Sequence, residues 1–392
     1  MFLETDPLWL QSLFTAAVTL GAGGSLFVFA LNRKLSFVEF LHRSVLAGIV
    51  LVTLACASLA GLAVAYGWMG YTGLKVYLLL PGSILLVVLF GEIRLVLQRW
   101  RYHASPPVSR INFHFEGRSL VAEHVSSSSD RKFHPITTTD LALLRYEVEV
   151  AGLGLTQGAA RRSLKVVQLS DFHYSPRLPF AYFRSAVELA IQEEADLVLL
   201  TGDFVTYQED AVRLPELFEG LRGRLGLFAT LGNHDYWSGA APVLQGLKQA
   251  GVHLIANDCV RLPLWDGLHL RLCGIDDPWG VPAWQPPDFQ AGDLNLIISH
   301  SPDNIYRLIR YPFAGVFSGH FHAGQVRFPG FGALVVPSRY GRRFNRGHFR
   351  FKNFASSSDT HLFVSAGVGS ATPLLRIYCQ PEIIVVNFYI VS

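Results

Sequence analysis

The stretch that decides the fold reads SGHFHAGQ, residues Ser318–Gln325, and it places two histidines between two glycines. It follows directly on a short apolar run, Gly315–Phe317, which is typical of a buried strand. In a strand-like stretch, side chains two residues apart share a face, so His320 and His322 can leave one turn toward a common site. The sequence therefore predicts a strand that ends in a pair of imidazoles.

Four other apolar runs end in the same way, in clusters of Asp, Asn or His. They are Leu164–Leu169 before Asp171 and His173, Asp196–Leu200 before Asp203, Leu227–Leu231 before Asn233, His234 and Asp235, and Leu294–Ile298 before His300. Longer mixed segments such as Phe180–Glu193 and Ala241–Ala250 lie between the runs, and their apolar spacing suits helices. Strands that alternate with helices indicate a layered α/β domain.

The strand ends of an α/β sheet converge on one crevice, where ligands bind. Here five such ends would gather carboxylates, an Asn amide and imidazoles in one place. Carboxylates that close repel one another, and bound cations remove the conflict. A mixture of carboxylate and imidazole without thiolate suits Mn, Fe or Zn, so the sequence predicts a divalent metal centre.

The ordered set of motifs resembles the calcineurin-like metallophosphoesterase superfamily, from about Leu164 to the end of the chain. The motifs are DFH at 171–173, GD at 202–203, GNHD at 232–235, SH at 299–300 and GHFH at 319–322. Within the superfamily the chain looks most similar to the membrane-attached bacterial phosphodiesterase branch, because it carries GHFHAGQ and a late PEI at Pro381–Ile383. The resemblance implies a four-layer αββα sandwich.

The resemblance also implies two divalent metal ions. The first would be held by Asp171, His173, Asp203 and His322, and the second by Asp203, Asn233, His300 and His320, with Asp203 bridging. Two such ions can share a hydroxide, lower its pKa toward neutrality and clamp phosphate oxygens for in-line attack. His234 is the candidate to stabilise the transition-state oxygen or to protonate the leaving group, and Asp235 the candidate to orient it.

We therefore expect a membrane-anchored hydrolase of phosphodiester or pyrophosphate bonds, with lipid-linked or nucleotide-linked substrates. The alternative is a catalytically inactive binding or scaffold module on the same fold. Loss of ligand positions would favour the scaffold, and here all seven positions carry a metal-binding residue type. The net charge of +3 is too small to indicate a nucleic-acid partner.

The first hundred residues carry most of the apolar excess of a chain that is 50% hydrophobic. Leu8–Ala30 and Val45–Tyr66 are long enough to cross a bilayer, and Val76–Gly91 becomes so with Ile93–Leu97. The organisation predicted is a transmembrane region over 1–98, a linker over 99–140 with a short strand near Arg110–Phe115, and the phosphoesterase domain over 141–392.

Basic residues favour the cytoplasmic side of a membrane. Between the first two spans lie Arg33, Lys34 and Arg43, and at or after the third lie Arg94, Arg99 and Arg101. We therefore expect a multi-pass protein of the inner or plasma membrane with a cytoplasmic catalytic domain, or an outward-facing domain if the third segment only lies in the interface. The four cysteines, at 56, 259, 273 and 379, form no close metal-type pairs and no dense disulfide framework, and Cys259 and Cys273, on two predicted neighbouring strands, are interpreted as free buried thiols.

A basic and aromatic stretch occupies Ser338–Phe354. It is either an exposed basic loop or a contact with anionic headgroups or with the phosphate of a lipid substrate. In the second case Arg342, Arg343 and Arg346 would make the contact.

Overall fold

The computed structural model describes residues 90, 93–94, 96–122, 135–151, 153, 162–265, 267–276, 278–280, 284–329, 332–333 and 335–391. The chain divides into two units, Met1–Trp100 and Arg101–Ser392, and the second is described below. The predicted spans at 8–30 and 45–66 lie outside the described residues, as does most of the third. No helix within the described part of the chain has the length and apolarity to cross a bilayer.

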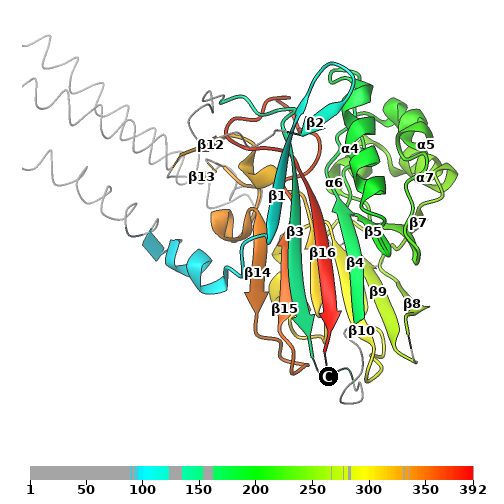
Figure 1. Ribbon diagram of the computed structural model, residues 1–392, viewed down its shortest axis with the longest axis vertical. Coiled ribbons are helices and arrows are strands. Elements are labelled where there is room, and N and C mark those ends of the chain that lie inside the picture. Colours follow the sequence, from blue (N-terminus) through cyan, green and yellow to red (C-terminus); the bar gives the residue numbers. More distant parts are fainter. Residues whose placement is uncertain are drawn as a thin grey trace, which may run out of the picture. The chain divides into compact units, whose positions relative to one another are not determined.

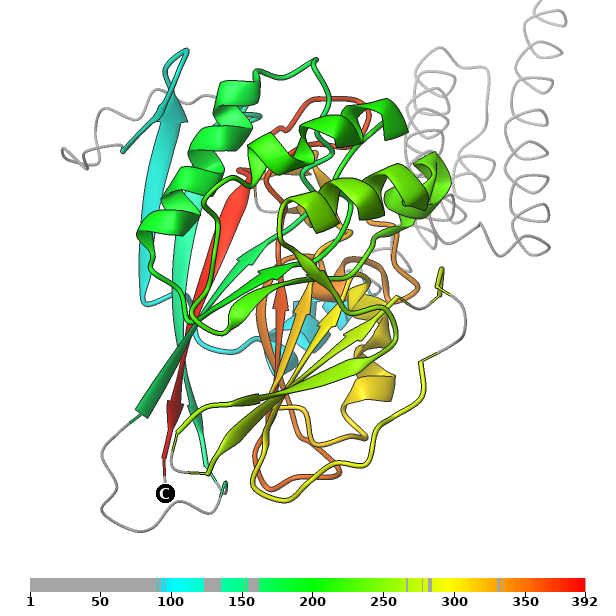
Figure 2. The ribbon, with the colours of Figure 1, turned by 90° about the vertical axis from the view of Figure 1, so that its right-hand side faces the viewer.

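Two β-sheets pack face to face in the second unit (Figures 1 and 2). The eight-stranded sheet has the order β2 (Leu120–Ala122), β1 (Ser109–Phe115), β3 (Leu141–Val150), β16 (Glu382–Ile390), β4 (Arg162–Leu169), β5 (Leu197–Leu200), β6 (Gly226–Ala229) and β7 (His253–Leu254). The six-stranded sheet has the order β14 (Gly347–Phe351), β15 (Thr360–Val364), β11 (Gly315–Ser318), β10 (Leu294–Ser299), β9 (His269–Ile275) and β8 (Cys259–Pro263). A small hairpin joins β12 (Arg327–Phe328) and β13 (Gly332–Ala333).

Helices cover the outer faces of the two sheets (Figure 2). The outer face of the larger sheet carries α4 (Phe180–Gln192), the 3-10 turn Gln208–Arg213, α5 (Leu214–Leu217) and α7 (Ala240–Gln249), while α6 (Asn233–Ser238) leads into α7. The smaller sheet carries α8 (Ile305–Leu308) and the 3-10 turn Gly341–Phe344. The mixed α/β sandwich predicted from the sequence is confirmed, and α4 and α7 occupy the two segments whose spacing predicts helices.

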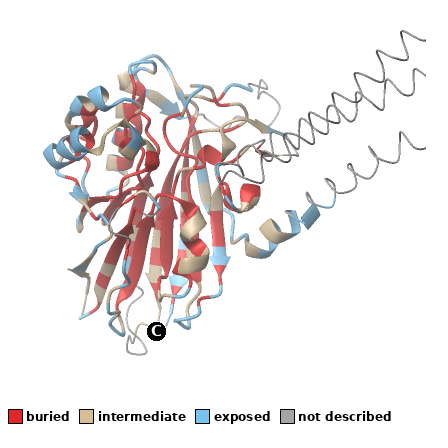
Figure 3. Ribbon diagram, turned by 180° about the vertical axis from the view of Figure 1, so that it is seen from behind, coloured by how far each residue is buried: buried red, intermediate tan, exposed pale blue. Residues whose placement is uncertain are grey.

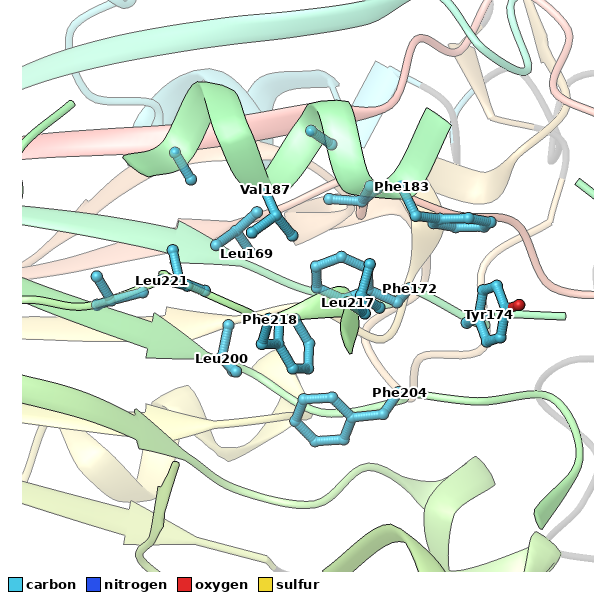
Figure 4. Close-up of a cluster of buried hydrophobic side chains, with 14 of the residues drawn as sticks. Leu169, Phe172, Tyr174, Phe183, Val187, Leu200, Phe204, Leu217, Phe218 and Leu221 are labelled. Atoms are coloured by element: carbon cyan, nitrogen blue, oxygen red, sulfur yellow. The ribbon is translucent and has the colours of Figure 1, made fainter. Parts of the chain in front are cut away.

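The central strands are largely apolar because they are buried on both faces. In β4, Val166 packs toward the second sheet while its neighbour Val167 packs toward the helices. Figure 4 shows the core beneath α4, where Val187 of the helix lies beside Leu169 and Phe183 lies beside Phe172 and Tyr174. Figure 3 shows the same division at the scale of the fold, with buried strands and exposed outer helix faces. Burying each of these side chains stabilises the fold by roughly 1.5–3 kcal/mol.

The direction of the strands places the predicted polar clusters together. Strands β4, β5 and β6 are parallel, and so are β9, β10, β11 and β15. The carboxyl ends of parallel neighbours meet at one edge of a sheet. All five apolar runs predicted as strands are strands in the structure, namely β4, β5, β6, β10 and β11.

Two features differ from the simplest interpretation of the sequence. The stretch assigned to a linker contributes two strands, β1 and β2, to the larger sheet. Strand β1 contains the predicted strand and pairs with both β2 and β3. The prediction of free thiols is wrong for Cys259 and Cys273, which form a disulfide. They lie directly opposite each other in the antiparallel β8–β9 pair, where side chains of partners share a face. Cys379 is free and buried.

Candidate metal centre

The structure brings the predicted ligands together at the edge where the strands end. Two overlapping groups, in each of which the ligand atoms lie within 4.8 Å of one another, consist of Asp171, His173, Asp203 and His322, and of Asp203, His300 and His320. The predicted ligand Asn233, at the start of α6, adjoins the second group. Asp203 is common to both groups, as a bridging carboxylate would be.

The first group consists of two imidazoles that face each other beside two carboxylates. Nε2 of His173 lies 2.9 Å from Nε2 of His322 and 3.3 Å from Oδ2 of Asp203. Nε2 of His322 lies 3.4 Å from Oδ1 of Asp171. All four side chains are buried, so the site on which their polar atoms converge is shielded from bulk water.

The second group approaches the same carboxylate oxygen of Asp203 as the first. Nε2 of His300 lies 3.2 Å from Oδ2 of Asp203 and 3.2 Å from Oδ1 of Asn233. The rings of His300 and His320 lie 5.0 Å apart. Nδ1 of His300 donates a hydrogen bond of 2.6 Å to the carbonyl oxygen of Thr201, which leaves the Nε2 lone pair directed at the cluster.

The electrostatics of the cluster suit divalent cations. Burial would raise the pKa of the Asp203 carboxyl, but His300 and His173 outweigh it and hold that pKa well below its usual value. Burial raises the pKa of Asp171 and lowers that of His320 to about 3. A buried set of carboxylates, an amide oxygen and imidazoles matches the ligands preferred by Mn, Fe and Zn, so these residues fit a two-metal site.

The backbone of the ligand loops is held in an uncommon conformation. Five of the predicted ligands have positive φ, namely Asp171 (51°), His173 (41°), Asp203 (57°), His320 (70°) and His322 (47°). Left-handed conformations at residues other than glycine cost of order 1–3 kcal/mol each and cluster at functional sites, where the surrounding structure enforces them. The strain here coincides with the predicted ligands themselves.

Aromatic side chains anchor these strained loops in the core. Phe172 lies between two predicted ligands and packs edge-on against Phe218, with ring centroids 5.1 Å apart. Phe204 follows Asp203 and packs against the same ring. Figure 4 shows Phe172, Phe204 and Phe218 gathered in the cluster beneath α4. Their burial fixes the position of the neighbouring ligands.

His234 lies beside the first group without belonging to it. Its ring lies 4.6 Å from that of His173, and its backbone N–H donates to Oδ1 of Asp203 at 2.8 Å. Burial lowers the pKa of the His234 imidazole to about 4, although the nearby Asp203 carboxylate acts in the opposite direction. His234 is therefore a neutral imidazole near pH 7, placed to donate or accept one hydrogen bond.

The prediction that Asp235 orients His234 does not match the geometry. Both carboxylate oxygens of Asp235 accept backbone N–H groups, from Asp203, Phe204 and Gly232, each at 2.8 Å. The carboxylate thus ties the loop after β5 to the loop after β6. Its contribution is to position Asp203.

Several residues around the centre carry no sequence motif. The buried Arg376 donates from Nη2 to Nδ1 of His322 at 3.2 Å and to the carbonyl oxygen of Ala366 at 2.6 Å, which holds the His322 ring from behind. Trp279 lies 5.2 Å from the ring of His320, and Trp237 lies 5.0 Å from that of His234. Arg376 and Trp279 are distant in the chain from the histidines they contact, whereas Trp237 lies on α6 with His234.

The prediction that three arginines face a lipid surface conflicts with their burial. Arg342 is buried and donates to the carbonyl oxygen of Ala333 at 2.9 Å. Arg346 pairs with the fully buried Glu382 of the PEI motif at 2.9 Å. Arg343 donates to the hydroxyl of Tyr306 at 2.8 Å. Guanidinium groups directed into the fold stabilise the loop and leave little charge available to a headgroup.

Comparisons with known proteins agree with the site. Residues 164–324 match the family described as calcineurin-like phosphoesterase. The chain is 28% identical over 229 residues to the uncharacterized metallophosphoesterase YkuE of Bacillus subtilis, which covers 56% of this chain and 77% of that protein. It is 29% identical over 224 residues to the phosphodiesterase YaeI of Escherichia coli, covering 56% and 80%.

A third relative is named for a defined substrate. The chain is 26% identical over 217 residues to the UDP-2,3-diacylglucosamine pyrophosphatase LpxG of Chlamydia trachomatis, which covers 42% of this chain and 65% of that protein. The three alignments leave more than two fifths of this chain unmatched.

Proposed function

We propose that the protein hydrolyses phosphodiester or pyrophosphate bonds with the help of two divalent metal ions, because residues 164–324 match the calcineurin-like phosphoesterase family and contain most of the candidate ligands. The observation that carries the proposal is the sharing of Asp203 by two buried ligand groups. When bound, the ions would polarise the phosphoryl oxygens and lower the pKa of a water.

The protein's own residues would then position the substrate and manage one proton. His234 lies beside the ligands and is not itself a predicted ligand, so its imidazole can donate a hydrogen bond to a phosphoryl oxygen or to the leaving oxygen. Its backbone bond to Asp203 fixes it relative to the metal ligands. Asp235 and Arg376 keep Asp203 and His322 in place, and so preserve the distances between ligands.

We further propose that the substrate is lipid-linked or nucleotide-linked and that the chain is anchored in a membrane. The name of LpxG supports a substrate in which a nucleotide and a lipid share a pyrophosphate. The three apolar segments before residue 98 support anchoring. An enzyme held at the bilayer keeps its site close to a lipid-linked substrate.

The side of the membrane is decided by two opposing arguments. The basic residues flanking the apolar segments favour a cytoplasmic domain. The Cys259–Cys273 disulfide favours an oxidising compartment, because cytosolic thiols are kept reduced. We propose the cytoplasmic orientation from the charge pattern. In sealed right-side-out vesicles, we expect residues 101–392 to be protected from added protease and to be digested after permeabilisation. Digestion without permeabilisation would place the domain on the outer side of the membrane.

Hydrolysis of bis-p-nitrophenyl phosphate tests the enzymatic proposal. The full chain, purified in detergent, should release nitrophenol when manganese is supplied and lose the activity on chelation. Retention of bound metal without turnover of this ester, of sugar nucleotides or of phospholipids would favour the scaffold alternative instead.

A further inference from the structure

A cavity of about 350 Å³ opens beside His234. It is lined by Thr206, Tyr207, Gln208, Glu209, His234, Trp237 and Ser238. Two of the lining residues are large aromatics that remain exposed, with Trp237 at 67% and Tyr207 at 41%. Exposed aromatic rings next to a reaction site are typical of surfaces that bind a substrate group.

The cavity is attached directly to the metal centre. The His234 ring lies between the two, 4.6 Å from the ring of His173 and 5.0 Å from that of Trp237. Thr206, another lining residue, donates from its hydroxyl to the carbonyl oxygen of His173 at 3.0 Å. A group in the cavity would therefore be part of a molecule whose phosphate reaches the centre.

The side chain of Arg177 holds Tyr207, one of the two aromatic residues that line the cavity. Nη2 of Arg177 donates to the hydroxyl of Tyr207 at 3.3 Å, and the guanidinium carbon lies 5.7 Å from the ring centroid. These contacts hold the phenol ring in place before a ligand arrives. A preorganised ring loses less entropy on binding than a mobile one.

The remaining lining is polar and selects against an acyl chain. Thr206, Gln208, Glu209 and Ser238 contribute hydroxyl, amide and carboxylate groups. Within the described part of the chain, the buried hydroxyl of Ser238 has no hydrogen-bond partner. A hydrocarbon would leave such groups unpaired, at a cost in binding. A planar heterocycle offers two faces for stacking and a polar edge for these groups.

We propose that this cavity binds the nucleobase of a nucleotide-containing substrate, stacked on Trp237 with its polar edge toward Glu209 and Ser238. The inference rests on the phosphoesterase function proposed above and narrows its substrate class. It makes Trp237 a specificity-determining residue, since the indole contacts the part of the substrate that differs between a nucleotide and another phosphoester.

Direct binding tests the inference with two probes that share a phosphate and a ribose. UMP and ribose 5-phosphate are titrated calorimetrically into the full chain in detergent with manganese. UMP should bind about tenfold more tightly, because stacking of one base contributes a factor of that size. Trp237→Leu should remove this difference, while Phe354→Leu, at an aromatic that is 74% exposed outside the cavity, should preserve it.

Three outcomes would overturn the inference: equal affinity of the wild type for both probes, a preference for UMP that survives Trp237→Leu, or tighter, Trp237-dependent binding of dihexanoyl phosphatidic acid. The last would assign the cavity to acyl chains. The binding assay does not depend on turnover. Failure to hydrolyse bis-p-nitrophenyl phosphate, sugar nucleotides and phospholipids would refute the phosphoesterase proposal, while the comparison of UMP with ribose 5-phosphate could still be interpreted.

Discussion

Nε2 of His173 lies 2.9 Å from Nε2 of His322, although 149 positions separate the two residues in the chain. Two ring nitrogens at this distance share either a proton or a cation. Since Asp171 and Asp203 complete the same group, a cation satisfies all four side chains where a single proton would not.

Replacing Asp203, the carboxylate shared by the two ligand groups, should therefore remove metal from both groups. Asp203→Asn removes the charge common to the two ligand groups but keeps an oxygen for the His234 N–H. We expect metal content, measured by mass spectrometry of the purified protein, to fall by most of its value and activity to fall by about a thousandfold or more. Asp303→Asn, a partly buried carboxylate outside the centre, is the control and should keep its metal.

His234 should separate chemistry from metal binding. His234→Ala removes the imidazole beside the ligands, so kcat should fall by about 10²–10⁴ while metal content stays at the wild-type value. Because the backbone N–H to Asp203 survives the change, the ligand geometry is retained. Parallel loss of metal and activity would reassign His234 to the ligands.

Sequence reasoning locates the strands and the ligands because both depend on local chemistry. Each ligand follows an apolar run that can only be a buried strand, as β4 before Asp171 and β11 before His320 illustrate. Arg376 could not be found in this way, because its role arises from its contact with His322, 54 positions earlier. The arginines after Ser338 are predicted to be exposed because the sequence shows their charge but not their partners. The buried Glu382 that pairs with Arg346 is such a partner, and only the fold brings the two together.

Gly319 supplies the close approach that lets β11 deliver two imidazoles. A Cβ atom there would lie 1.9 Å from the Ser170 hydroxyl and 2.1 Å from Oδ2 of Asp171. Gly319→Ala should displace Asp171, which lowers metal content and reduces the unfolding midpoint by several degrees. Gly251→Ala meets no atom within 4 Å and adds only backbone strain, so its metal content should match the wild type. Normal metal content in both variants would mean that the loop adapts.

The protein should lose stability as the pH falls below 6.5, and part of the loss belongs to His348. Burial, followed by the neighbouring His361, lowers the His348 pKa to about 3, so the folded state resists a proton that the unfolded state accepts. Stability from this group is full above pH 6.5 and is lost toward the folded-state pKa, at about 1.4 kcal/mol per pH unit at most.

His348→Phe tests this assignment, because a phenyl ring can keep the stacking on Phe363 without titrating. Denaturant unfolding at pH 7 and pH 5 should show a drop in the free energy of unfolding that is smaller in the variant by on the order of 1–2 kcal/mol. An identical drop in both proteins would show that His348 is protonated in the folded state.

The Cys259–Cys273 disulfide should stabilise the edge of the smaller sheet. The bond closes a loop with a sequence separation of 14 across the β8–β9 pair, and closing a loop of this size stabilises the folded state by about 3 kcal/mol in the chain-entropy description. Cys259→Ser should lower the free energy of unfolding by about that amount, and reductant should do the same to the wild type but have no further effect on the variant. Because β8 is an edge strand that contributes no ligand, metal content should not change. Alkylation of both thiols in the native, unreduced protein would contradict the pairing and would remove the argument for an oxidising compartment with it.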